Sequence, residues 1–147
     1  MTRTSSRLLK SALAALSIAM PFAAAADTNP LVAERWKTRP VVVVVPAAGD
    51  PLLRKVEAAL RQTATREAFI DREMVLYTVV AGEGRRNDNA MAPAQTRALL
   101  GALKLDAAGA PTFVLVGKDG GVKMTEGAGV DLQAVFAEID RMPMRQR

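Results

Sequence analysis

The sequence contains no cysteine and no histidine among its 147 residues. Without a thiolate the chain cannot carry out thiol–disulfide exchange, and it cannot form a disulfide. It also lacks the usual zinc ligands and the base of a histidine-dependent catalytic triad. Any acid–base chemistry would therefore depend on carboxylates, lysine or the single tyrosine, and the fold must be stabilised by its apolar core.

Aromatic side chains are scarce as well, at 4% of the residues, and there is one tryptophan. Trp36 lies within the segment Arg-Trp-Lys-Thr-Arg-Pro at residues 35–40. We expect Trp36 to pack over one edge of the core, as a solitary tryptophan usually does. The alternative is a tryptophan that stacks on a ligand.

The sequence has no concentrated basic segment, although its formal net charge is +5. Three of the basic residues, Arg3, Arg7 and Lys10, precede the first acidic residue, Asp27, and the remaining charges are nearly balanced. A nucleic-acid-binding domain normally presents a basic face or stripe. The sequence therefore does not predict a nucleic-acid partner.

Residues 1–26 have the pattern of a secretory signal peptide. The basic start is followed by a ten-residue apolar stretch at residues 11–20, by Pro21 and by an alanine run that offers a cleavage site before Asp27. The pattern predicts cleavage and a periplasmic or secreted domain at residues 27–147, with a retained anchor or a cytosolic start as the alternatives. We expect no membrane span after cleavage, because no later stretch approaches the roughly 18 apolar residues required.

The rest of the chain alternates between strand and helix patterns. Five consecutive valines at residues 41–45 predict a strand buried on both faces. Asp50 and Pro51 suit the N-cap and first position of a helix that runs, with a break, through Phe69. The later elements are expected as a strand at 74–80, a polar loop at 82–92, a helix at 93–105, a strand at 112–116, a turn at 118–121, a strand at 122–125 and a helix between Gly129 and Pro143. Helical crossovers predict that the first three strands are parallel and that the fourth is antiparallel to the third.

This order resembles that of a thioredoxin-like domain, and residues 110–116 with the turn at 118–121 carry the clearest local match. The resemblance implies a three-layer α/β sandwich with a central mixed sheet of about four strands flanked by helices. It also implies a cis peptide bond before Pro111, whereas the low frequency of cis X–Pro bonds, about 5%, favours trans, so the sequence leaves the isomer open. The position that holds the redox cysteines in thioredoxins corresponds to residues 46–50, which contain none.

Four stretches are similar to a narrower family of uncharacterised thioredoxin-like domains called P-DUDES. They are residues 35–40, 70–73, 117–123 and 139–145. The family occurs as short exported bacterial proteins and as a module of extracellular proteins of the equarin and sushi-repeat type. The resemblance implies a fold and an extracytoplasmic setting, but it transfers no catalytic residue.

Two places are candidate binding sites. Asp50 and Pro111 flank the position of the thioredoxin redox site, although capping of a helix is the simpler role for Asp50. Lys118, Lys123 and Arg145, together with Arg141 and Arg147, would form a basic patch if the predicted hairpin and the C-terminus lie close together. Such a patch would bind a glycan, a lipid headgroup or an acidic protein face, and a solvated charged surface is the alternative.

Two methionines flank Pro143 just beyond the last predicted helix. Met142 and Met144 either cap the core or present an adaptable apolar contact to a partner. The glycine-containing segments at 82–84 and 117–121 lack the features of a phosphate loop, and the acidic residues of the polar loop are too sparse for calcium. The sequence therefore predicts neither a cofactor nor a metal.

We expect a non-catalytic binding or scaffolding module whose partner is an unknown protein or an anionic ligand. This expectation rests on a thioredoxin-like fold in which the position of the redox site lacks the reactive cysteines. One alternative is an enzyme of a non-thiol reaction class that uses carboxylates or Lys118, and another is a protein with a structural role in the cell envelope.

Overall fold

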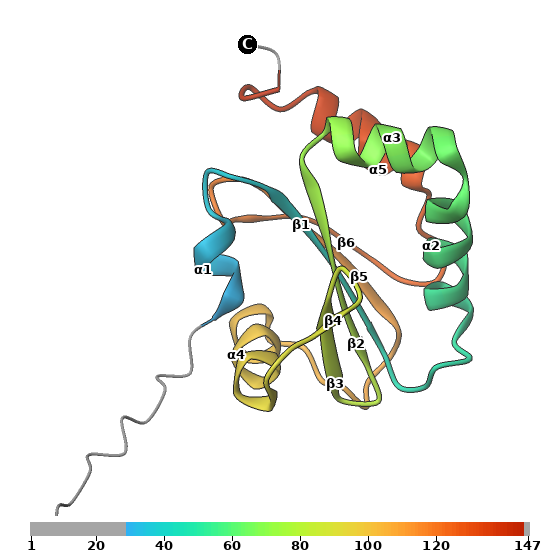
Figure 1. Ribbon diagram of the computed structural model, residues 1–147, viewed down its shortest axis with the longest axis vertical. Helices are drawn as coiled ribbons and strands as arrows, with labels where there is room; N and C mark the ends of the chain where they lie inside the picture. The colour runs from blue at the N-terminus through green and yellow to red at the C-terminus, as the bar shows by residue number, and fades with distance from the viewer. Residues whose placement is uncertain (1–28, 146–147) are drawn as a thin grey trace, which may run out of the picture.

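The computed structural model describes residues 29–145, so the predicted signal peptide lies outside the described residues. The chain forms an α/β sandwich in which helices cover both faces of one sheet (Figure 1). Among residues 29–145, no helix is long and apolar enough to cross a membrane. The elements are α1 (Pro30–Glu34), β1 (Arg39–Val45), α2 (Pro51–Arg61), α3 (Thr63–Asp71), β2 (Met74–Val80), β3 (Glu83–Arg86), β4 (Asn89–Ala90), α4 (Pro93–Leu103), β5 (Thr112–Val116), β6 (Val122–Glu126) and α5 (Leu132–Asp140).

The central mixed sheet has six strands in the order β4-β3-β2-β1-β5-β6. Two of them, β3 and β4, form a hairpin in the segment that the sequence predicted to be a loop. A two-residue turn, Asn87 and Asp88, joins β3 to β4, and a second one, Ala81 and Gly82, joins β2 to β3. All four turn residues have positive φ, as type I′ hairpin turns require.

The pairing of β5 corrects the expectation of three parallel strands. β1 and β2 are parallel, but β5 runs antiparallel to β1, with Thr112 opposite Val44 and Leu115 opposite Val41. The crossover rule applies to a single helical connection. Here the β3–β4 hairpin, α4 and residues 104–111 intervene, and they bring the chain back to the end of the sheet at which β1 and β2 finish, so that β5 starts opposite Val44.

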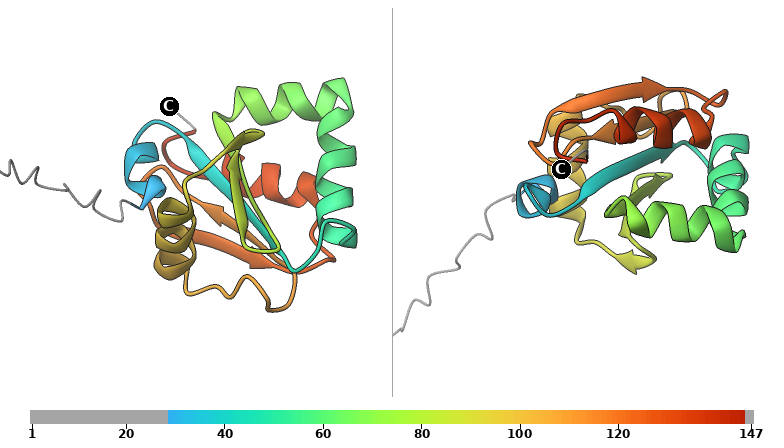
Figure 2. Two further views of the ribbon diagram at one scale, coloured as in Figure 1. Left: turned by 60° about the horizontal axis from the view of Figure 1, so that its bottom comes forward. Right: turned by 90° about the horizontal axis from the view of Figure 1, so that it is seen from above.

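The valines of β1 pack into a separate apolar layer on each face of the sheet. Val41, Val43 and Val45 contact the layer under α2, α3 and α5, whereas Val42 and Val44 contact the layer under α1 and α4. Figure 2 shows these two groups of helices on opposite sides of the strands. The prediction of a strand buried on both faces is therefore confirmed.

The predicted start of the first long helix is confirmed at atomic detail. The Asp50 carboxylate accepts a hydrogen bond of 2.9 Å from the backbone N–H of Leu52, and Pro51 is the first residue of α2. The predicted break occurs at Gln62, whose extended backbone separates α2 from α3. Residues 29–145 contain no cis peptide bond, so the bond before Pro111 is trans, as the base rate favours, and not cis, as the resemblance implied.

Substitution of Gly84 by alanine is expected to destabilise the fold by about 1 to 3 kcal/mol. A Cβ atom at Gly84 would lie 3.0 Å from Thr96 Cγ2 and closer still to Thr96 Oγ1, and both residues are buried between β3 and α4. Adding Thr96→Ala to Gly84→Ala should restore part of the loss. Urea unfolding measures both effects.

The matched control for this pair is Gly101→Ala in α4. A Cβ atom there meets nothing within 4 Å, and alanine is a better helix former than glycine by about 1 kcal/mol. The control should therefore gain stability. Equal effects at positions 84 and 101 would show that α4 does not pack on β3 as described.

Candidate functional site

Four distant parts of the chain meet at the end of the sheet where β1 begins and β5 ends. The backbone N–H of Trp36 donates a hydrogen bond of 2.7 Å to the Lys118 carbonyl, and that of Arg39 donates one of 2.8 Å to the Glu73 carbonyl. These contacts join residues 35–40 to the stretches 117–123 and 70–73. Arg145 joins the last stretch, 139–145, to the others, as described below. We call this region the β1 corner.

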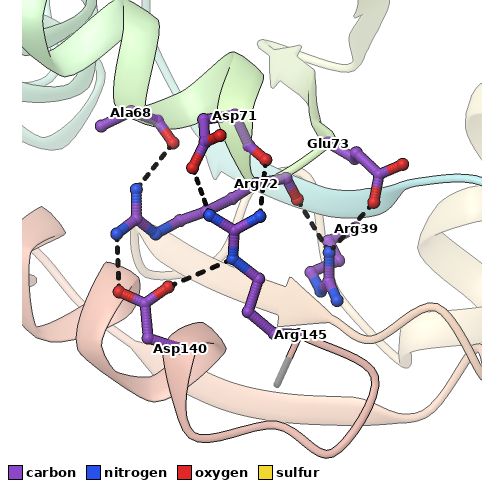
Figure 3. Close-up of polar contacts among 7 residues, drawn as sticks. All are labelled: Arg39, Ala68, Asp71, Arg72, Glu73, Asp140 and Arg145. Atoms are coloured by element: carbon purple, nitrogen blue, oxygen red, sulfur yellow. Dashed lines mark hydrogen bonds and ion pairs between the residues drawn. The ribbon is translucent and has the colours of Figure 1, made fainter. Parts of the chain in front are cut away.

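Arg72 fastens α3 to α5 at the β1 corner (Figure 3). Its guanidinium donates hydrogen bonds of 2.9 Å to the Ala68 carbonyl and 2.6 Å to the Asp140 carboxylate. The same guanidinium lies 4.8 Å from the ring centroid of Phe136, within the range of a cation–π contact. One side chain therefore bonds α3 and α5 and also packs on an aromatic ring of α5.

Arg145 fixes the segment that follows α5. It donates a hydrogen bond of 2.8 Å to the Asp71 carbonyl and forms an ion pair with the Asp71 carboxylate. Its Nε atom lies 3.5 Å from Asp140 Oδ1. The hydrogen bond from Arg72, followed by that from Arg145, holds the pKa of Asp140 below its usual value. Residues 142–144, between these two anchors, are thus held against the body of the domain.

Glu73 connects the start of β1 to the turn after β5. Its carboxylate forms an ion pair with Lys118 and lies 3.6 Å from the buried guanidinium of Arg39. The Lys118 hydrogen bond lowers the pKa of Glu73. Arg39, which is only 1% exposed, donates a further hydrogen bond of 2.9 Å to the Arg72 carbonyl. These bonds make the β1 corner a cross-linked part of the fold.

A hollow of about 370 Å³ opens at the β1 corner. Its lining combines apolar and charged side chains with one glycine: Trp36, Gly117, Lys118, Asp119, Lys123, Met142, Pro143 and Met144. This volume falls in the range of small ligand pockets. We call it the Trp36 hollow.

Trp36 is 67% exposed, so the prediction that it packs over the core is wrong. Its backbone has φ +64°, a left-handed conformation that is uncommon for a bulky residue. Together with the hydrogen bond from its N–H to Lys118, this backbone turns the side chain outward. Met142 packs against the core, as one of the two interpretations predicted, whereas Met144 is exposed, and its contact with a partner stays a prediction.

The predicted hairpin and the segment after α5 do lie close together, but the basic side chains that they carry are paired with carboxylates. Lys118 and Lys123 line the Trp36 hollow, and Arg145 follows Met144. Each of the three forms an ion pair, with Glu73, Asp119 and Asp71 respectively. Arg141 pairs with Glu138, and Arg147 lies outside the described residues.

Two cations that the sequence interpretation did not assign to the patch flank Trp36. Arg35 and Lys37 are exposed, and neither side chain forms an ion pair or hydrogen bond within residues 29–145. The Arg35 guanidinium lies over the turn after β5, since a Cβ atom at Gly120 would be 2.6 Å from its Nε. No sequence pattern would have identified Arg35 and Lys37, because their position depends on the left-handed backbone at residue 36.

Asp50 and Pro111 lie at the opposite end of the sheet from the other predicted site residues. Asp50 is the N-cap of α2 in the loop that follows β1, and Pro111 precedes Thr112, which pairs with Val44. The structure therefore divides the five predicted site residues into two groups, Asp50 with Pro111 and Lys118 with Lys123 and Arg145. Asp50 serves as the helix cap described above.

Two larger hollows of about 520 and 530 Å³ share Glu57, Leu76 and Asp88 and form a groove between α2 and the β2–β3 edge. The groove has an apolar floor and a rim that mixes acidic and basic residues. Because both signs of charge occur along it, the groove indicates no particular ligand class.

A buried polar network that the sequence did not reveal connects α1 to β2 and β3. The Glu34 carboxylate accepts hydrogen bonds of 2.7 Å from the Tyr77 hydroxyl, the Thr38 hydroxyl and Arg86 Nε. Burial alone would raise the pKa of Glu34, but the bonds from Arg86, Thr38 and Tyr77 together lower it. Burial, followed by the contact with Glu34, raises the pKa of the Tyr77 hydroxyl.

A family model described as a domain of unknown function (DUF4174) matches residues 30–147, which is most of the chain. The match includes the β1 corner and both groups of predicted site residues. No curated protein and no solved structure matches the sequence.

Proposed function

The chain belongs to this family of unknown function, and from that premise we propose that it is a non-catalytic binding module with the Trp36 hollow as its binding site. The proposal includes an extracytoplasmic setting, in the periplasm or outside the cell, because residues 1–26 have the pattern of a signal peptide. The partner is a protein or another anionic ligand that takes up the positive charge around Trp36. The finer identity as a thioredoxin-like domain of the P-DUDES type is part of the same proposal.

The exposure of Trp36 is the observation that carries this proposal. A solvent-exposed indole gains nothing from burial in the core, and its positive φ adds backbone strain. Exposed aromatic residues and methionines are enriched at binding surfaces, where tryptophan supplies large contact area and methionine adapts its shape. Here Trp36, Met142 and Met144 line one hollow.

The state of the ionisable groups favours binding over the alternative of a non-thiol enzyme. Lys118, the lysine proposed for such chemistry, is already held by Glu73. Glu34 is buried, and its carboxylate already accepts hydrogen bonds from Tyr77, Thr38 and Arg86. A catalytic acid or base needs a position from which it can reach a substrate.

Photo-crosslinking in the cell tests the position of the binding site. A benzoylphenylalanine residue replaces Met144 in the full chain, and in a separate strain it replaces Arg97, an exposed residue of α4, which covers the face of the sheet opposite α5. We expect discrete crosslinked products from position 144 and none from position 97. Products from position 97 alone, or from neither position in a correctly folded protein, would contradict the proposal.

A further inference from the structure

We propose that the occupant of the Trp36 hollow is an acidic peptide segment of a partner protein, which inserts one apolar side chain between Trp36 and the methionines. This inference rests on the proposed function and goes beyond it by naming the chemistry of the partner. Three properties of the hollow support it: its apolar walls, the excess of positive charge around it, and its recessed shape.

The walls of the hollow match an apolar side chain. Trp36, Met142, Pro143 and Met144 provide indole, thioether and ring carbons. Its charged side chains, Lys118, Asp119 and Lys123, are engaged in ion pairs. A sugar would need several partners for its hydroxyl groups, and few polar groups here are uncommitted. Methionine walls, in contrast, adapt to aliphatic or aromatic side chains of different shape.

The charges around the hollow favour acidic residues on either side of that apolar side chain. Four cations surround it, two in its lining and two on the turn that carries Trp36, against the carboxylates of Asp119 and Glu73. The two on the turn, Arg35 and Lys37, have no carboxylate partner within residues 29–145. Complementary acidic residues would take up this excess and accelerate encounter with the partner.

The shape and the carboxylates argue against a lipid surface as the occupant. Trp36 and Met144 border a concave space rather than a flat apolar face, so a bilayer would not reach the inner walls. Asp119, which is exposed, and Glu73, which is 55% exposed, would also approach the anionic headgroups. A narrow peptide can place its carboxylates between these groups, whereas a headgroup layer cannot.

The site is also pre-organised, because both of its walls are fixed independently of any ligand. The bond from the Trp36 N–H to the Lys118 carbonyl fixes one wall. Arg145, through Asp71, fixes the segment that supplies Met142 and Met144. A rigid site loses less entropy on binding, which permits specific recognition of a short peptide.

Trp36 is itself the reporter for the test, since it is the only tryptophan in the chain. The purified exported protein is titrated with tryptophan-free peptides in which Leu, Ile, Phe or Met stands at the centre of a run of glutamates. We expect a saturable blue shift of the Trp36 emission. Replacing the central residue by serine should weaken binding by about tenfold or more, because the apolar contact is lost.

Ionic strength and charge reversal test the electrostatic part. Raising the salt concentration from 50 to 500 mM should weaken peptide binding several-fold, since Arg35 and Lys37 are exposed and salt screens them. Lys37→Glu should weaken it further, and Met144→Asp should abolish the emission shift. The matched control is Arg97→Glu, a charge reversal on the exposed surface of α4, which should bind like the unmodified protein.

An oligouronate and vesicles of phosphatidylglycerol serve as the competing probes. A Trp36 shift with either of them and none with the acidic peptides overturns this inference but leaves the proposed binding function intact. No shift with any probe overturns the inference as well. If crosslinking at position 144 also yields no product, the proposed function fails with it, so the two failures are distinguishable.

Discussion

Glu34→Ala is expected to lower the free energy of unfolding by about 3 kcal/mol. The substitution leaves the Tyr77 hydroxyl, on a residue only 1% exposed, without its partner, and a buried hydroxyl without a hydrogen bond costs about 1 to 3 kcal/mol. It also removes the charge-assisted bond from Arg86, which is partly exposed and contributes less. Chemical denaturation at neutral pH measures the loss.

The matched control for Glu34→Ala is Glu57→Ala. Glu57 is an exposed glutamate in the middle of α2 whose side chain forms no ion pair or hydrogen bond within residues 29–145. Its loss should change stability by no more than about 0.5 kcal/mol. Tyr77→Phe removes the hydroxyl but keeps the ring, so it should cost less than Glu34→Ala. Equal stability of Glu34→Ala and Glu57→Ala would show that Glu34 does not connect α1 to the sheet.

Glu34 also makes part of the free energy of unfolding depend on pH. The pKa of Glu34 is lowered in the folded state from the ordinary value of 4.5. A carboxyl group of this kind contributes its stability above its unfolded-state pKa and loses it as the pH falls through its folded-state pKa. The unmodified protein should therefore lose more stability between pH 6 and pH 3 than Glu34→Ala does. Both proteins should still lose some stability as the pH falls, because the pKa values of three other carboxyl groups are also lowered: Asp140, Glu73 and Asp119.

Arg72→Ala is expected to destabilise the domain by about 2 kcal/mol and to loosen the segment that lines the Trp36 hollow. Arg72 is largely buried, and its loss removes a hydrogen bond to a charged group and the contact with the Phe136 ring. The end of α5 would then be held to α3 mainly by Arg145. Thermal unfolding measures the stability, and hydrogen exchange over residues 140–145 measures the loosening.

Arg66→Ala is the control for Arg72→Ala. Arg66 lies on α3, the helix that Arg72 follows, is exposed and forms no ion pair or hydrogen bond through its side chain within residues 29–145. It should leave both the unfolding temperature and the exchange rates nearly unchanged. A stable Arg72→Ala protein with unaltered exchange would indicate that the ionic contacts of Figure 3 do not hold the C-terminal segment in place.

Much of the fold follows from local patterns in the sequence. The valine run at residues 41–45 predicts the central strand because β-branched residues without polar alternation suit a strand covered on both faces. Asp50 and Pro51 identify a helix start because their chemistry satisfies the first turn locally. The absence of cysteine excludes thiol chemistry whatever the fold. Each of these inferences depends on neighbouring residues or on composition, so a single sequence is sufficient for it.

The β1 corner depends on contacts between distant residues, and only the tertiary structure decided it. The direction of β5 depends on the whole path from β2, and the exposure of Trp36 depends on one left-handed backbone angle and a bond to Lys118, 82 positions away. Likewise, the sequence around Glu34 has no distinctive pattern, and Glu34 becomes a buried hydrogen-bond acceptor because the sheet places Tyr77 and Arg86 beside it. Local patterns determine which elements form, whereas burial and charge pairing at a site are set by elements that meet only after the chain has folded.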